Sequence, residues 1–150
     1  MKSIMKVLGI VCMIAIFWSC EKEKESISQE EKDFHALIND HRTVVSATAV
    51  GFPVVIWEKA REHSVNIVNG TASGHSGFEE REQYLKIKIG AKEVKEIVLV
   101  GNGIKQEDFD EMMSIQSNKA IIEGDFVHCA VGIRSNSDQD FFYTIIFVRM

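Results

Sequence analysis

Apolar positions in the first half of the chain recur with the spacing of helices. Ser28 followed by Glu31 has the form of a capping box, which predicts the start of a helix. Apolar residues and one histidine then fall on a single face of this helix: Phe34, Leu37, Ile38, His41, Val44 and Val45. We interpret His41 as a buried histidine with a hydrogen-bond partner, in preference to a ligand-binding residue.

Two more helices are predicted before residue 90. Apolar and small residues at helical spacing mark the first over residues 57–68, and Asn69-Gly70 ends it like a glycine C-cap. The second spans residues 78–88 and is broken by Gly90. Its inward face is predicted to carry Phe78, Tyr84, Leu85 and Ile87. Residues 71–77 form the loop between these helices, and loops commonly present functional side chains.

The second half of the chain mixes strands with one more helix. A β-branched run over residues 94–100 and an alternating run over residues 127–133 predict two strands. Between them, Phe109, Met112 and Met113 predict a helix over residues 106–116. The last strand, residues 141–148, is apolar on both faces and is predicted to lie centrally in the sheet. This order of elements predicts an α+β fold, a three-layer α–β–α sandwich.

The first twenty residues have the pattern of a targeting segment. Lys2 and Lys6 give a positive start to an apolar run that is shorter than the roughly 20 residues of a membrane span. The run ends at Cys20, which resembles the lipidated cysteine of a bacterial lipoprotein signal. The expected organisation is a signal peptide at residues 1–19, Cys20 and a tether at 20–30, and a domain at 31–150. An ordinary signal peptide or an uncleaved anchor is the alternative.

Charge and cysteine content narrow the partners and the compartment. The formal net charge is −5 and no basic stripe offsets it, which argues against a nucleic-acid partner. If Cys12 leaves with the signal and Cys20 carries lipid, Cys129 is the remaining thiol and no internal disulfide forms. We therefore expect a bacterial cell-envelope protein, periplasmic or surface-exposed, that is anchored to a membrane through Cys20.

His75 lies in a glycine-flanked loop that superficially resembles a nucleophile elbow. Ser76 is not predicted to be a nucleophile, because that motif requires a glycine where Phe78 stands and a strand leading into the turn. The sequence contains no zinc-binding helix pair of histidines and no Cys-x-x-Cys motif. His75 is the candidate functional residue of this segment.

Several short segments, taken in order, resemble the CAP superfamily of cysteine-rich secretory, antigen 5 and pathogenesis-related proteins, which carry an SCP-like domain. The matching segments include residues 37–42 (LINDHR), 60–64 (AREHS), 74–81 (GHSGFEER), 123–128 (EGDFVH), 131–133 (VGI) and 142–144 (FYT). The resemblance covers about residues 34–149 and implies an α–β–α sandwich. It also implies a cleft with two histidines and two acids, which in some members binds a divalent metal. His75 matches the first histidine and Glu96 matches one acid.

The match at this cleft is incomplete. Asn118 stands where the resemblance implies the second histidine. Apolar residues stand at three positions that are usually polar: Ile97, Ile121 and Ile145. Because zinc needs three or four strong ligands, the remaining pair of His75 and Glu96 is expected to bind it weakly. His128 is a candidate replacement ligand, and no cofactor beyond such a weakly bound divalent metal is expected.

Two functions follow from this pattern. The first is a non-catalytic binding module that presents a degenerate cleft to a small-molecule, lipid or protein ligand. The second is an envelope hydrolase, a peptidase or a glycan- or lipid-cleaving enzyme, with His75 and Glu96 as catalytic residues. The lost polar residues favour binding, because a catalytic base needs an orienting partner. A decayed relative with a purely structural role is a third hypothesis.

Overall fold

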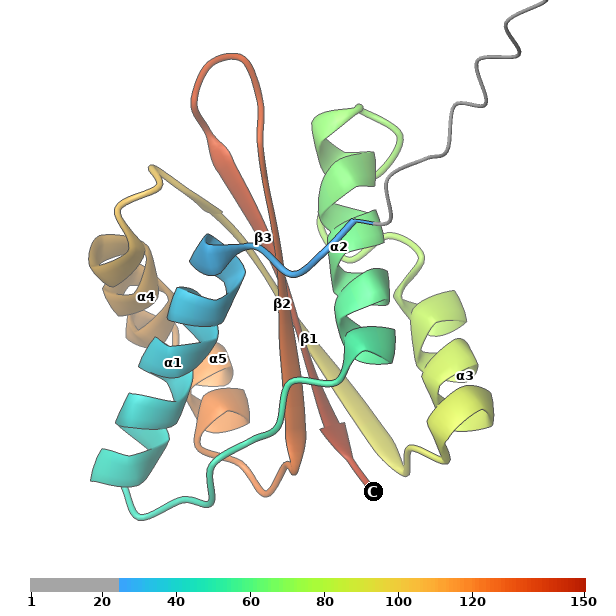
Figure 1. Cartoon of the computed structure of the whole chain (residues 1–150), viewed down its shortest axis with the longest axis vertical. Coiled ribbons are helices and arrows are strands. Elements are labelled where there is room, and N and C mark those ends of the chain that lie inside the picture. The colour runs from blue at the N-terminus through green and yellow to red at the C-terminus, as the bar shows by residue number, and fades with distance from the viewer. Residues whose placement is uncertain (1–24) are drawn as a thin grey trace, which may run out of the picture.

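The computed structural model describes residues 25–150 (Figure 1), so the predicted signal at residues 1–19 and the lipidation site Cys20 lie outside the described part. Five helices and three strands follow one another along the described chain. They are α1 (Gln29–Val44), α2 (Val54–Val68), α3 (Phe78–Ile89), β1 (Glu93–Gly101), α4 (Lys105–Ser114), α5 (Gln116–Ile122), β2 (His128–Ser135) and β3 (Phe141–Arg149). Within residues 25–150, no helix has both the length and the apolar character of a membrane-spanning segment.

The three strands form one antiparallel sheet in the order β1-β3-β2, which confirms the predicted central position of the last strand. Ile146 at the middle of β3 lies opposite Glu96 of β1 on one side and Ala130 of β2 on the other. The middle residues of β3 are buried on both faces. Both faces are therefore covered by other layers, as a strand without polar alternation requires.

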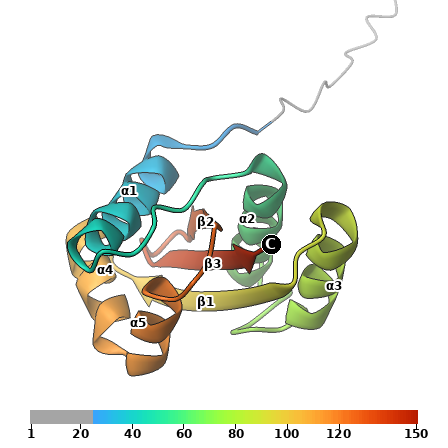
Figure 2. The ribbon, with the colours of Figure 1, turned by 90° about the horizontal axis from the view of Figure 1, so that it is seen from below.

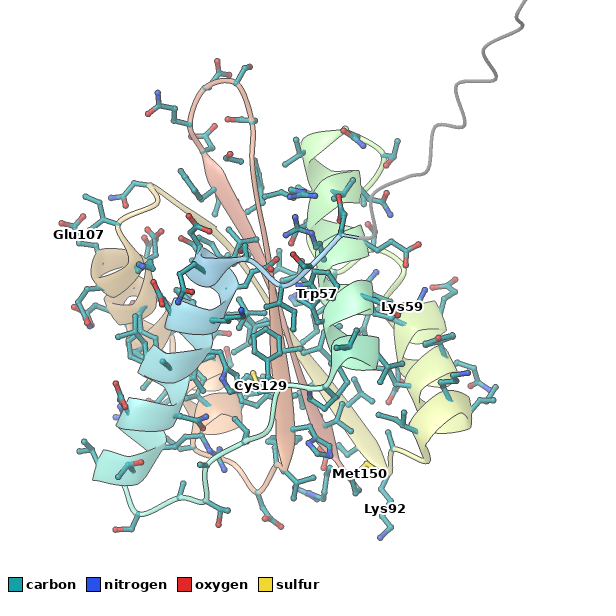
Figure 3. The ribbon with its side chains drawn as sticks, viewed as in Figure 1. Trp57, Lys59, Lys92, Glu107, Cys129 and Met150 are labelled. Atoms are coloured by element: carbon teal, nitrogen blue, oxygen red, sulfur yellow. The ribbon has the colours of Figure 1, made fainter. Side chains whose placement is uncertain are left out.

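Helices cover the two faces of this sheet. Helices α1, α4 and α5 lie on one face and α2 and α3 on the other (Figure 1, Figure 2). Each face has its own apolar cluster, and these two clusters form the core. Figure 3 shows two sides of α2: Trp57 lies toward the sheet, and Lys59 lies toward α3.

The predicted capping box begins α1: the Ser28 side chain accepts a hydrogen bond from the Glu31 amide, and the Glu31 side chain accepts one from the Ser28 amide. Glu31 is fully buried, and its carboxylate also ties α1 to α2 and β2. It accepts further hydrogen bonds from Trp57 Nε1, Arg61 Nη1 and the amide of Ile133. Four donors on one buried carboxylate offset the cost of removing its charge from water.

The apolar face predicted for the end of α1 is wrong. Val44 is 82% exposed and Val45 is 41% exposed. The buried stripe instead continues to Arg42, which is 1% exposed. The Arg42 guanidinium donates to four backbone carbonyls, those of Thr48, Ile122, Gly124 and Phe126. His41 has the predicted partner, since its Nε2 lies 2.9 Å from Glu123 Oε1, although its ring stays partly exposed.

Two other helices differ from the prediction. In α3 only Leu85 is buried, whereas Ile87 is 76% exposed and Tyr84 is 36% exposed, because the helix lies over the edge strand β1 and beside α2, with its other sides in solvent. The helix predicted over residues 106–116 ends at Ser114, and α5 follows as a separate helix. Ile115 between them has an extended backbone with ψ of 114°. No glycine or proline marks this break, so it has no signal in the sequence.

Candidate functional site

A compact turn over residues 73–77 presents His75. Gly74 and Gly77 have φ angles of +50° and +72°, a conformation that favours glycine. The Ser76 hydroxyl accepts a hydrogen bond from the amide of Ser73 at 3.0 Å. These local contacts fold the loop back on itself, immediately before α3 begins.

A carboxylate lies beneath this turn. Glu96 belongs to β1 and points to the face covered by α2 and α3, because its partner across the sheet, Ile146, packs in the cluster on that face. The Glu96 side chain is 1% exposed, so its charge requires partners within the protein.

Two residues of the 74–81 segment supply those partners. Arg81 donates through Nε to Oε2 of Glu96 and through Nη2 to Oε1, both at 2.8 Å, which is a two-pronged ion pair. His75 Nδ1 lies 3.1 Å from Oε1 of the same carboxylate. The structure thus brings His75 and Glu96 together and adds a cation to them.

The pairing with Glu96 defines the chemistry of the His75 ring. A carboxylate oxygen accepts hydrogen bonds, so a neutral His75 carries its proton on Nδ1 and leaves a lone pair on Nε2. The His75 side chain is 59% exposed, whereas that of Arg81 is 11% exposed. The imidazole is therefore oriented from below by a buried acid and remains open to solvent.

An open hollow of about 290 Å³ lies between α2 and α3, next to this pair. Its α2 wall carries Lys59, Glu62, His63 and Asn66, and its α3 wall carries Gly77, Glu80, Arg81 and Tyr84. Lys59 Nζ lies 4.6 Å from the centre of the Tyr84 ring and so bridges the two walls. Arg81 lines the hollow, but His75 and Glu96 do not.

His63 fixes the other side of the turn. Its ring is almost fully buried, and its Nε2 lies 2.7 Å from the carbonyl oxygen of Gly74. Burial lowers the pKa of His63, which favours a neutral ring that donates its Nε2 proton to that carbonyl.

Sequence reasoning missed two residues of this site, Arg81 and His63. Both belong to segments that carry the family resemblance, but neither matched a ligand position there. Arg81 stands four residues after Gly77, the residue that precedes α3. Its position in the first helical turn after the His75 loop could have indicated from the sequence that it lies near this loop.

The remaining predicted residues do not join the site. His128 lies on β2, two strands away from β1, which corresponds to about 10 Å at the usual strand spacing. Its Nδ1 is buried against Gly51 and has no hydrogen-bond partner among residues 25–150. Asn118 lies on α5 in the opposite layer, so an approach to His75 would have to pass around the edge strand β1.

The donor set does not fit a divalent metal such as zinc. Within residues 25–150, no three side chains of histidine, cysteine, aspartate or glutamate converge. Both oxygens of Glu96 already accept hydrogen bonds from the Arg81 cation. His75 Nε2 alone is open, whereas a zinc site takes three or four such ligands.

Three solved structures resemble this architecture. An outer surface protein from Borrelia burgdorferi has a TM-score of 0.72 at 14% identity, over 84% of this chain and 96% of that protein. An extracellular SCP-domain protein from Bacillus anthracis has a TM-score of 0.68 at 15% identity, over 85% of this chain. A cysteine-rich secretory protein from Staphylococcus aureus has a TM-score of 0.64 at 9% identity, also over 85% of this chain. The chain has the SCP fold.

This similarity confirms the predicted α–β–α sandwich. The chain spans 45% of the Bacillus protein and 41% of the Staphylococcus protein, so it corresponds to less than half of each. No protein-family model and no curated protein sequence matches the chain. Within the SCP fold of this chain, the acid predicted by resemblance does contact the predicted histidine.

Proposed function

We propose that this chain is a lipid-anchored protein of the bacterial cell envelope whose SCP-fold domain binds a ligand without catalysing a reaction. The observation that carries the proposal is the lining of the hollow between α2 and α3. Neither His75 nor Glu96 lines this space, so a molecule bound in the hollow would not contact the pair that catalysis would require. Arg81 both lines the hollow and holds Glu96.

The lining supports a polar ligand, a small molecule or a segment of a protein, over a lipid chain. Its side chains include the cations Lys59 and Arg81, two carboxylates, an amide, an imidazole and a phenol, of which Arg81 and His63 already hydrogen-bond within the protein. Such mixed donors and acceptors suit a ligand that can both give and accept hydrogen bonds. The volume of about 290 Å³ equals that of roughly ten water molecules at about 30 Å³ each.

An envelope hydrolase is the second candidate, and one observation favours it. His75 is held through Nδ1 by the Glu96 carboxylate and exposes Nε2, which is how a carboxylate orients a histidine base. Against it, the Ser76 hydroxyl next to this histidine serves the turn, so the histidine would have to act on water.

A bulky side chain in the hollow separates the two functions. Asn66 lines the hollow, while Asn69 caps the same helix at an exposed position, so Asn66→Trp and Asn69→Trp form a matched pair. We expect native mass spectrometry of protein purified from its own host to find a bound polar molecule in the wild type and in Asn69→Trp, and none in Asn66→Trp. His75→Ala should retain that molecule. Loss of a measurable hydrolytic activity in His75→Ala would instead support the enzyme.

The anchoring part of the proposal rests on the sequence of residues 1–20 and on the extracellular or outer-surface nature of the structural relatives. Two or more acyl chains on Cys20 would hold the protein at a membrane, because each buried methylene contributes about 0.8 kcal/mol. Cys20→Ala should therefore move the protein out of the membrane fraction or block its processing. Cys129→Ala is the control, since this buried thiol is not at the acylation site. Unchanged membrane partition and unchanged mass in Cys20→Ala would refute the anchor.

A further inference from the structure

We infer that Arg81 is the resident cation of this site: its guanidinium holds Glu96 and the His75 turn in place, so that the turn keeps its conformation without a metal ion. This inference concerns how the site is built and does not depend on which ligand the hollow binds.

Arg81 connects three parts of the chain at one point. Its Nε and Nη2 donate to Glu96 of β1, and its Nη1 donates to the carbonyl oxygen of Ser76 at 2.9 Å. Because Arg81 itself belongs to α3, one side chain joins the edge strand, the helix and the turn. A guanidinium has the planar fork that such a set of acceptors requires, whereas an ammonium group does not.

Charge balance at Glu96 supports this role. The carboxylate is buried, and one guanidinium neutralises its single charge. His75 Nδ1 adds a further hydrogen bond to the same carboxylate. A divalent ion placed here would face an arginine within hydrogen-bond distance of the same carboxylate, and the two cations would repel each other.

The geometry of Glu96 leaves little room for an additional ligand bond. A carboxylate has about four lone-pair directions. Oε1 accepts from both His75 and Arg81, and Oε2 accepts from Arg81. Three of the four directions are therefore taken by donors that also hold the turn, so a metal bound through Glu96 would have to displace at least part of that arrangement.

The turn depends on this arrangement. Its own contacts are the Ser73–Ser76 hydrogen bonds and the hydrogen bond between the amide of Phe78 and the carbonyl of His75. On the β1 side, the contacts that hold it to the domain run through Arg81 and Glu96. We therefore expect loss of the guanidinium to release His75 from its fixed orientation.

The first experiment compares Arg81→Met, which removes the charge at similar length, with Lys86→Met on the exposed side of the same helix. Thermal unfolding is followed in a chelator, in millimolar zinc and in millimolar methylguanidinium, with sodium chloride at equal ionic strength as the reference. For the wild type, and likewise for Lys86→Met, the unfolding temperature should be the same in all four solutions. Arg81→Met should unfold at a lower temperature, and methylguanidinium should restore part of the loss in a saturable way.

Three results would overturn the inference. They are equal stability of Arg81→Met and wild type, no rescue of Arg81→Met by methylguanidinium, and a rise in the unfolding temperature of the wild type in zinc. Saturable rescue would show that methylguanidinium occupies the space left by the Arg81 guanidinium, because a general solvent effect does not saturate.

If Arg81→Met does not fold, the double variant Arg81→Met/Glu96→Gln tests whether Arg81 is the counter-ion of Glu96. If Arg81 acts as the counter-ion, removing the buried charge as well should return part of the stability, and the double variant should be recovered folded. A double variant that is less stable than Arg81→Met, or that also fails to fold, would show that the two residues contribute independently and would overturn the inference.

Discussion

The two faces of the sheet differ in chemistry, although the same three strands supply both. On the face covered by α1, α4 and α5, the buried residues of the strands are apolar apart from one tyrosine: Ile97, Leu99, Cys129, Val131, Ile133, Tyr143, Ile145 and Phe147. On the face covered by α2 and α3, Glu96, Thr144 and Gly132 interrupt the apolar positions.

Each polar residue of the α2 face has a specific partner. The Ser64 hydroxyl of α2 lies 2.9 Å from both Thr144 Oγ1 and the Gly132 carbonyl oxygen. The backbone of α2 lies directly against Gly132, and a Cβ there would meet the Arg61 amide nitrogen at 2.3 Å, so this position requires glycine. Successive side chains of a strand point to opposite faces of the sheet. One face of this sheet therefore provides the buried apolar surface, and the other positions the residues of the site.

The largest effect should come from the apolar face. Phe147 is fully buried, and Phe147→Ala should lower the free energy of unfolding by about 3–5 kcal/mol because it leaves a cavity. Urea denaturation measures this loss. In the protein that remains folded, ligand binding in the hollow should be unchanged. A loss below about 1 kcal/mol would mean that this face contributes much less than its burial indicates.

A smaller effect is expected from a polar position on the α2 face. Thr144→Val keeps the shape of the side chain and removes the hydroxyl that faces Ser64, so it should cost about 0.5–1.5 kcal/mol. Ser64→Ala in the same background tests the pairing. The double variant should lose less than the two single losses combined, and full additivity would contradict the contact.

The smallest effect concerns pH. Burial lowers the pKa of His63 in the folded chain. Below about pH 6.5, His63 is therefore protonated more readily in the unfolded chain than in the folded chain. Stability should therefore decrease as the pH falls below that value. His63→Gln keeps a donor for the Gly74 carbonyl and does not titrate, so its loss of stability between pH 7 and pH 5 should be smaller. Burial also lowers the pKa of His35, on α1, so some pH dependence should remain. An unchanged slope in His63→Gln would contradict the assignment.

Most of the fold could be predicted from the sequence because local signals and burial agree. The Ser28 capping box begins α1, Gly90 in the left-handed conformation ends α3, and the uninterrupted apolar run of β3 lies centrally. Prediction failed where a polar residue is buried or an apolar one is exposed. Arg42 takes the place expected for Val44 and Val45, because backbone carbonyls from a distant segment satisfy its guanidinium.

The site could be predicted only in part. The resemblance paired His75 with Glu96, which lie 21 residues apart in sequence and in contact in the structure. It gave no role to Arg81, because the pairing of a surface helix with an edge strand is a tertiary feature without a periodic signal. His128 was proposed as a replacement ligand from residue type alone, and its position across the sheet excludes it from this pair.

The buried Glu31 carboxylate has a mechanical consequence. Any pull on the segment before residue 25 first meets Glu25, which is paired with Arg61 of α2 and Arg134 of β2, and then reaches Ser28 at the start of α1. There the load does not pass down one helix alone, because Glu31 distributes it to Trp57 and Arg61 of α2 and to the backbone of β2 at Ile133. Tension on the N-terminal end is therefore shared by both layers of helices and by the sheet between them, well before it reaches the turn that carries His75.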